Sequence, residues 1–182
     1  MPDRSRFLTP TLKRTTMKSN TALTVSIGLL AVVDTYLTAT ILPIPVWVTF
    51  IAWASFFVVG GGSKGFLQSM ASNLTGLVIS SLTLLGITLA GGSPLIAAIS
   101  VGIGSAVMVQ ASRATLLSIL PAIVWGFAST VGTTVATGKP ITTVGIENPA
   151  LVAATALLVG ALFGFVSEVF AETLTEKRMT TA

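Results

Sequence analysis

Long apolar stretches, interrupted by short breaks rich in glycine, proline or charge, extend from about residue 21 to residue 171. A helix needs about 20 apolar residues to cross a bilayer. The pattern therefore predicts an all-α fold, a polytopic transmembrane helix bundle. Its six spans are expected at residues 21–41, 44–61, 66–89, 94–111, 115–136 and 149–171.

Turn-forming residues separate these spans, notably at Leu42–Pro45, Gly60–Gly65 and Gly91–Pro94. Within the fifth span, Pro121 removes a helix hydrogen bond and frees the carbonyl of Leu117. We therefore expect a kinked or broken helix there.

The composition indicates a membrane location. Of the 182 residues, 52% are hydrophobic and 9% are charged, and the mean hydropathy is +0.91. A soluble domain carries about 25% charged residues because its surface faces water. The lipid bilayer is therefore the expected surrounding of residues 21–171.

Lysine and arginine residues predict the orientation. With six spans, nine of the ten fall on one side of the membrane, and only Lys139 falls on the other. The positive-inside rule then places both termini in the cytoplasm. This distribution explains the net charge of +4, so no nucleic-acid partner is expected. The nine are Arg4, Arg6, Lys13, Arg14, Lys18, Lys64, Arg113, Lys177 and Arg178.

The two ends of the chain are more polar than the rest. We expect residues 1–20 to form a basic, disordered cytoplasmic lead-in and residues 172–182 to form a cytoplasmic tail. The lead-in is also rich in Ser and Thr, as a transit peptide is, and Met17 offers an alternative start.

Few residues are available for catalysis or cofactor binding. The chain contains no His and no Cys, and it lacks the H-E-x-x-H and G-x-S-x-G motifs. A phosphate-binding loop requires a hydroxyl residue directly after its lysine, but Gly65 follows Lys64. We therefore expect no enzyme activity, no metal and no cofactor, and we interpret Gly60–Gly65 as a cytoplasmic turn.

Four aromatic residues of the second span, Trp47, Phe50, Trp53 and Phe57, fall within about 120° of one helix face. Trp53 is expected near the middle of the membrane, where its indole N–H needs a partner. Two interpretations remain open. The stripe lines the path of a small solute, or it packs against neighbouring helices or lipid.

This aromatic and glycine-rich block resembles a known family. The pattern Pro45-x-Trp47-x-x-Phe50-x-Ala-Trp53-Ala-x-Phe-Phe57-x-x-Gly60-Gly, followed by Lys64-Gly65, is similar to that of an uncharacterised bacterial inner-membrane family, domain of unknown function 1097 (DUF1097). Gln110-Ala111 and Leu117-Ser118-x-x-Pro121 agree with the same family. The resemblance covers roughly residues 20–170. It implies a small polytopic protein of the bacterial cytoplasmic (inner) membrane and implies no activity.

A short motif recurs in the second and fifth spans. Ile51-x-Trp53-Ala54 with Val59-Gly60 matches Ile123-x-Trp125-Gly126 with Val131-Gly132. In a six-span protein these two helices run in opposite directions, so spans 1–3 and 4–6 would be inverted repeats. Transporters with such repeats bind their solute near the middle of the membrane. The alternative is a coincidence of a few identities.

The third span carries small and polar residues within about 100° of one another. At a rise of 1.5 Å per residue, this polar stripe extends over roughly 21 Å. It would line a pore, or it would allow close helix packing. Its members are Ser69, Ser72, Asn73, Gly76, Ser80 and Thr83.

Asp34 lies in the first span, about two turns from its outer end. An acidic side chain inside a span costs a few kcal/mol and is therefore a functional candidate. With the residues discussed above it completes the set of solute-path candidates. These are Asp34, Trp53, Phe57, Asn73, Ser80, Gln110 and Trp125.

Two small-residue motifs favour helix packing. Gly160-x-x-x-Gly164 lies in the sixth span and Ala98-x-x-x-Gly102 in the fourth. Both let backbones approach closely, either within the chain or between copies in a homo-oligomer.

Two functions remain open at this point. The leading hypothesis is a channel or facilitator for a small polar solute, because too few intramembrane charges exist for multi-ion coupling. The alternative is a non-transporting membrane scaffold or regulatory subunit. A continuous polar path open to water would favour the first, and a polar stripe consumed by helix contacts would favour the second.

Overall fold

The computed structural model describes residues 18–175, which form six α-helices and one short 3₁₀ helix. The elements are α1 (Ser19–Thr40), α2 (Val46–Val58), α3 (Gly62–Leu89), α4 (Pro94–Ala111), η1 (Thr115–Leu117), α5 (Leu120–Thr137) and α6 (Pro149–Leu174). The expectation of an all-α fold is confirmed for this part of the chain.

Five of these helices, all except α2, are long and apolar enough to cross a membrane. The protein is therefore a multi-pass membrane protein in contact with lipid. Helix α2 has 13 residues, which extend over about 20 Å, less than the hydrocarbon thickness of about 30 Å.

The expectation of a kinked or broken helix at Pro121 is met by a break before this residue and not by a kink within α5. Residues Thr115–Leu117 form the separate 3₁₀ helix η1, and Pro121 lies in the first turn of α5. A proline fits there because the first N–H groups of a helix have no intrahelical partner. The fifth helix therefore begins at Leu120 and not at residue 115.

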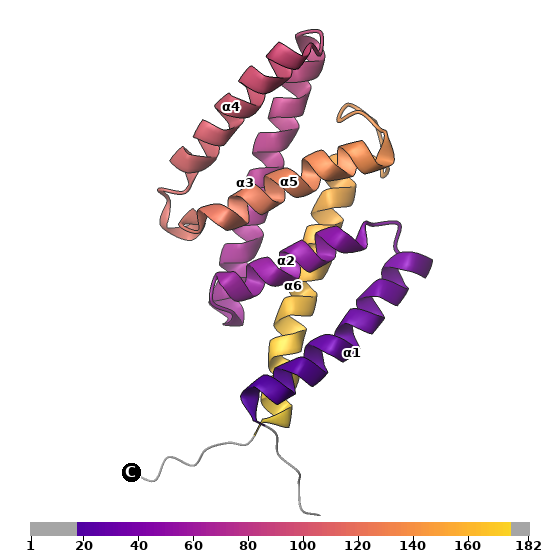
Figure 1. The fold of residues 1–182 in the computed structure, drawn as a ribbon, viewed down its shortest axis with the longest axis vertical. Coiled ribbons are helices and arrows are strands. Elements are labelled where there is room, and N and C mark those ends of the chain that lie inside the picture. Colours follow the sequence, from indigo (N-terminus) through magenta and orange to yellow (C-terminus); the bar gives the residue numbers. More distant parts are fainter. Residues whose placement is uncertain (1–17, 176–182) are drawn as a thin grey trace, which may run out of the picture.

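The helices form a layered arrangement around α3 and α6 (Figure 1). Helix α2 packs mainly on α6, and helix α5 packs mainly on α3. The outer helices are α1, which packs on α6, and α4, which packs on α3. Because α1 and α4 have only one packed side each, most of their surface faces lipid.

Glycines bring the backbones of these pairs into direct contact. A Cβ on Gly76 of α3 would come within 3 Å of the Ile123 carbonyl oxygen of α5. A Cβ on Gly160 of α6 would meet the Thr49 carbonyl of α2 in the same way. Small residues of this kind hold membrane helices together, because lipid provides no hydrophobic driving force between them.

The buried positions of α2 and α3 recur in α5 and α6. Every buried residue of α2 has a buried counterpart 74 positions later in α5, for example Ala52 and Gly126. Eight of the nine buried residues of α3 have a buried counterpart 84 positions later in α6, for example Gly76 and Gly160. The corresponding helices run in opposite directions (Figure 1).

The register expected from the Ile-x-Trp motif is wrong by two residues. That motif pairs Trp53 with Trp125, but Trp53 is buried whereas Trp125 is only half-buried. The residue 74 positions after Trp53 is Phe127, which is buried. A shift of two residues rotates a position by about 200° around the helix axis. Aligning the identical residues therefore pairs positions that lie on opposite faces of the two helices.

We predict that Gly76→Ala destabilises the protein by about 1–3 kcal/mol, because the new methyl group overlaps the backbone of α5. The matched control is Gly86→Ala on the same helix, where no atom lies within 4 Å of the Cβ position. The control should gain about 0.5–1 kcal/mol of stability. Unfolding in mixed detergent micelles measures both values, and equal stabilities for the two variants would contradict the close approach.

Candidate functional site

Thirteen polar side chains are buried among the described residues, and they lie where helices meet. The bilayer core offers no water, so each buried polar group needs a partner inside the protein. These residues are Ser26, Asp34, Thr49, Ser55, Ser69, Ser72, Asn73, Ser80, Thr83, Ser129, Thr130, Thr133 and Ser167.

Asn73 of α3 is at the centre of one group. Its Nδ2 donates to the hydroxyl oxygens of Ser55 and Ser69, each at 3.2 Å. The Ser69 hydroxyl also donates to Ser55, at 2.9 Å. These bonds tie α2 to α3 and fix the orientation of the amide. The Asn73 Oδ1 atom, by contrast, is buried without a partner.

The turn of three glycines allows α2 and α3 to lie together. Gly60, Gly61 and Gly62 all have positive φ, between 62° and 109°, which side chains disfavour. Glu168 of α6 accepts a hydrogen bond from the Gly62 N–H at 2.6 Å. Its carboxylate therefore stabilises the positive N-terminal end of α3. The glycines thus form a turn and bind Glu168, while Lys64 is exposed.

Trp53 is held by contacts with α6. Its indole Nε1 donates to the Ser167 hydroxyl at 3.0 Å, and its ring stacks on Phe163 with centroids 5.5 Å apart. The Ser26 hydroxyl of α1 donates to the Ser167 carbonyl at 2.6 Å. Helices α1, α2 and α6 therefore meet at Ser167, and the Trp53 N–H is satisfied inside the chain.

The polar stripe of α3 is buried at helix contacts. Ser69, Ser72, Asn73 and Ser80 are fully buried, and Thr83 is 9% exposed. Ser80 donates to the Leu77 carbonyl and Thr83 to the Ile79 carbonyl. In this conformation the stripe packs between helices and does not line an open path.

Within residues 18–175, four polar side-chain atoms remain buried without a partner. Besides Asn73 Oδ1 they are Asp34 Oδ1, Ser72 Oγ and Ser129 Oγ. The Asn73 backbone packs against Gly126, which lies one turn before Ser129 on α5. Asn73 thus lies at the α3–α5 contact, and Ser72 on α3 and Ser129 on α5 provide two further oxygens available for hydrogen bonding.

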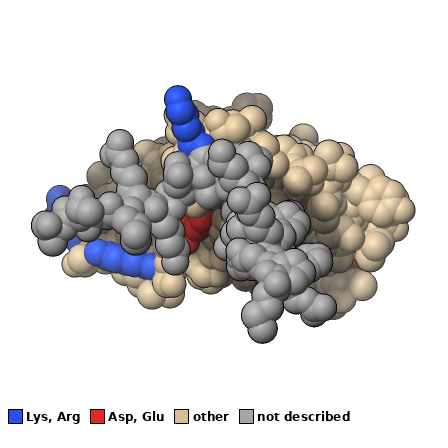
Figure 2. Space-filling model, turned by 90° about the horizontal axis from the view of Figure 1, so that it is seen from below, with Lys and Arg blue, Asp and Glu red and all other residues tan. Residues whose placement is uncertain are grey.

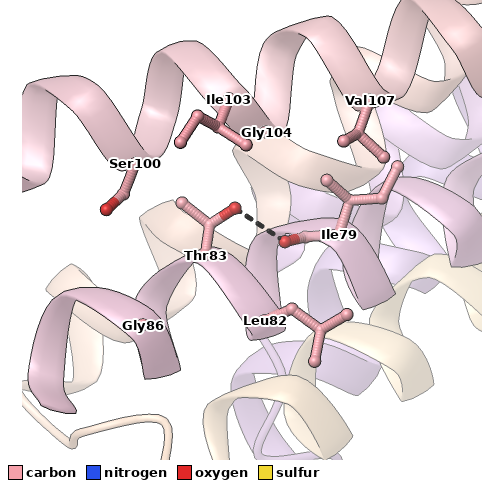
Figure 3. Close-up of a pocket in the computed structure, with 8 residues that line it drawn as sticks. All are labelled: Ile79, Leu82, Thr83, Gly86, Ser100, Ile103, Gly104 and Val107. Atoms are coloured by element: carbon pink, nitrogen blue, oxygen red, sulfur yellow. Dashed lines mark hydrogen bonds between the residues drawn. The ribbon is translucent and has the colours of Figure 1, made fainter.

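Cavities lie at the edges of this layer. A groove of about 260 Å³ runs between α3 and α4, and Thr83 and Ser100 are its polar residues (Figure 3). A second cavity of about 420 Å³ lies between the α1–α2 and α5–α6 connections. Lys139 and Glu147 line it and form an ion pair at 2.6 Å. The Lys139 ammonium holds the pKa of Glu147 below its usual range.

The structure separates the solute-path candidates predicted from the sequence. Asp34, Trp53, Asn73 and Ser80 are buried in different helix contacts. Phe57 and Trp125 are half-buried, and Gln110 is exposed on α4. The structure therefore does not gather these seven residues around one cavity.

The packing motifs also differ in their surroundings. Gly160 lies against Thr49, and a Cβ on Gly164 would overlap the Phe56 side chain. Ala98 and Gly102 are exposed, and no atom lies within 4 Å of the Cβ position of Gly102.

Sequence reasoning missed seven of the thirteen buried polar residues: Ser26, Thr49, Ser55, Ser129, Thr130, Thr133 and Ser167. The signal for Thr49 and Ser55 was present, because they are the only hydroxyl residues of α2. The interpretation of this helix rested on its aromatic residues instead.

Comparison with known proteins identifies the family. A family model described as "Protein of unknown function (DUF1097)" matches residues 24–172, so the chain belongs to this family. No curated protein and no solved structure matches the chain. The resemblance drawn from the aromatic and glycine-rich block is therefore confirmed, and the activity is left open.

We predict that Ser167→Ala destabilises the protein by about 1–3 kcal/mol, because it leaves the Trp53 N–H buried without an acceptor. The matched control is Ser129→Ala, which removes a buried hydroxyl oxygen that has no partner. Its free energy of unfolding should change by less than about 0.5 kcal/mol or rise. Equal losses in the two variants would contradict these assignments.

Proposed function

We propose that this DUF1097 protein moves a small polar solute across the membrane by rearranging two inverted three-helix halves, α1–α3 and α4–α6. The observation that supports this most is the match of buried positions between the antiparallel pairs α2 and α5, and α3 and α6. Inverted repeats of this type bind solute at their interface and expose it to each side in turn.

The chain crosses the membrane six times if α2 also spans it and the loops on either side of α2 lie in the interfacial regions. The described basic residues Lys18, Lys64 and Arg113 would then lie on the same side as both ends of the helical domain, and Lys139 on the other. Figure 2 views the molecule from below, the end where α1 begins, and shows basic side chains there together with acidic side chains. We infer cytoplasmic termini in a bacterial cytoplasmic membrane.

A facilitator that changes conformation fits the packing better than a permanently open channel. The polar stripe of α3 is buried, so a path along it has to open by movement of helices. The atoms left for a solute are the oxygens Ser72 Oγ, Asn73 Oδ1 and Ser129 Oγ. These oxygens can accept hydrogen bonds, and no basic side chain is buried among the described residues. We therefore favour an uncharged solute rich in N–H or O–H donors, such as urea or a short amide.

A non-transporting scaffold or regulatory subunit is the second candidate. The observation that favours it is the burial of the polar stripe by helix contacts. In that case the hydroxyls and Asn73 would serve only to join helices.

Stopped-flow light scattering on proteoliposomes tests the proposal with urea, glycerol, short amides and formate. We expect permeation of at least one donor-rich solute above that of empty vesicles. Asn73→Leu should reduce this flux about tenfold, the equivalent of one lost hydrogen bond of about 1.4 kcal/mol. Leu157 occupies the corresponding buried position of α6, so leucine suits this packing environment.

The control variant for the flux experiment is Ser105→Ala, which changes an exposed hydroxyl on α4. It should permeate the solute as the wild type does. Permeability equal to that of empty vesicles for every solute tested would support the scaffold.

A further inference from the structure

Asp34 and Thr49 form an isolated pair at the α1–α2 contact. Both side chains are fully buried. The Thr49 hydroxyl is hydrogen-bonded to Asp34 Oδ2, and Asp34 Oδ1 has no partner. The carboxyl group lies about 9 Å along α1 from the helix end at Thr40. The pair is therefore removed from water and makes one side-chain hydrogen bond.

The hydrogen bonds of Thr49 leave room for one mobile proton. Its hydroxyl oxygen lies 2.7 Å from the Val46 carbonyl and is also bonded to the Asp34 carboxyl. A hydroxyl has a single hydrogen and can donate only once. If Asp34 is ionised, that hydrogen goes to the carboxylate. If Asp34 is protonated, Asp34 donates to Thr49, and Thr49 donates to the Val46 carbonyl. The same atoms thus accommodate both protonation states.

The second half of the molecule has apolar residues at the positions that correspond to this polar pair. At the spacing of 74 that relates α2 to α5, Thr49 corresponds to Ile123 and Asp34 to Met108. Met108 and Ile123 are both buried in one apolar cluster. An apolar pair therefore fills the equivalent place. Because a buried acid is costly in a membrane span, its presence in the first half calls for a role besides packing.

No charged side chain of the described residues is bonded to Asp34. Helix α2 contains no titratable side chain. On α6, Glu168 is next to Ser167, which bonds Ser26, and Ser26 lies eight residues, about 12 Å, along α1 from Asp34. Glu172 lies one turn further toward the end of α6, and Tyr36 of α1 is exposed. Lys139 is paired with Glu147 outside the helices. Thr49 is thus the side chain to which the Asp34 carboxyl is bonded.

We propose that Asp34 and Thr49 form a proton-binding site. On binding, the proton joins the Asp34 carboxylate, and the hydrogen of Thr49 turns from Asp34 to the Val46 carbonyl. The exchange reverses the hydrogen bond between Asp34 of α1 and Thr49 of α2 and forms one within α2, to the Val46 carbonyl, so protonation removes the carboxylate charge from the α1–α2 contact. The proposal of a proton site depends only on this geometry, whereas its coupling to solute transport rests on the proposed function.

Infrared difference spectroscopy of the full chain in lipid vesicles tests the site without any solute. We expect a protonated-carboxyl C=O band that grows as the pH falls and that is lost in Asp34→Asn. In Thr49→Val the band should remain and move to higher frequency, because the carboxyl loses its hydrogen-bond partner. The absence of any Asp34-dependent band, or a band of constant size at every pH, would overturn the proposal.

The double variant Asp34→Met with Thr49→Ile controls for folding, because it transfers the apolar pair of the second half to the first. We expect it to fold with at least wild-type thermal stability, since replacing a buried polar pair by apolar residues is often neutral or stabilising. It should show no titrating carboxyl band. A severe loss of stability in this variant would mean that the pair is needed for packing, which would overturn its assignment as a site beyond the fold.

Solute flux measured against pH separates the two proposals. If flux occurs and varies with pH in the wild type but not in Asp34→Asn, the proton site is coupled to transport. If flux occurs without an Asp34-dependent band, the proton site fails and the transport function stands. If the band titrates but no solute permeates, the proton site stands and the transport function fails.

Discussion

Direct backbone contact at glycines is the interaction on which the rest of the structure depends. Lipid offers helices no hydrophobic reason to associate, so close packing and hydrogen bonds between helices must hold them together. Gly76 and Gly126 join α3 to α5, and Gly160 joins α2 to α6. Once these backbones touch, the side chains beside the glycines are enclosed. Asn73, whose own carbonyl lies against Gly126, is therefore buried and finds its partners in Ser55 of α2 and Ser69 of α3.

The two halves share a scaffold but not their chemistry. Glycines and small residues recur at equivalent positions, which keeps the helix crossings alike. The polar groups are concentrated in α1–α3, where Asp34 and Asn73 occupy the positions held by Met108 and Leu157 in the other half. Ser129 of α5 corresponds to Ser55 of α2, but its hydroxyl lacks the side-chain hydrogen bonds that Ser55 makes. Solute and proton chemistry would thus belong to the first half, against which the second half acts as a largely apolar counterpart.

The sequence predicted the features that depend on segment length and composition. Long apolar runs predicted where the helices lie, and the low content of charged residues indicated that a membrane surrounds them. Pro121 was misplaced because a proline in an apolar run can either kink a helix or begin one. The repeat register was missed because burial, not residue identity, defines it, as Trp53 and Phe127 illustrate. The partner of Asp34 could not be predicted, since a pairing between two helices depends on their crossing geometry.

The central claim is that the buried layer between the halves becomes accessible from each side of the membrane. Because the chain has no native cysteine, single cysteines can be introduced directly, at Ser72 for the layer and at the exposed Ser63 and Thr142 as markers of the two sides. Labelling with a membrane-impermeant maleimide from one side at a time in sealed vesicles is the most direct measurement. We expect the cysteine at position 72 to react slowly from both sides, while each marker reacts from one side only. Reaction of both markers with none at position 72 from either side would contradict it.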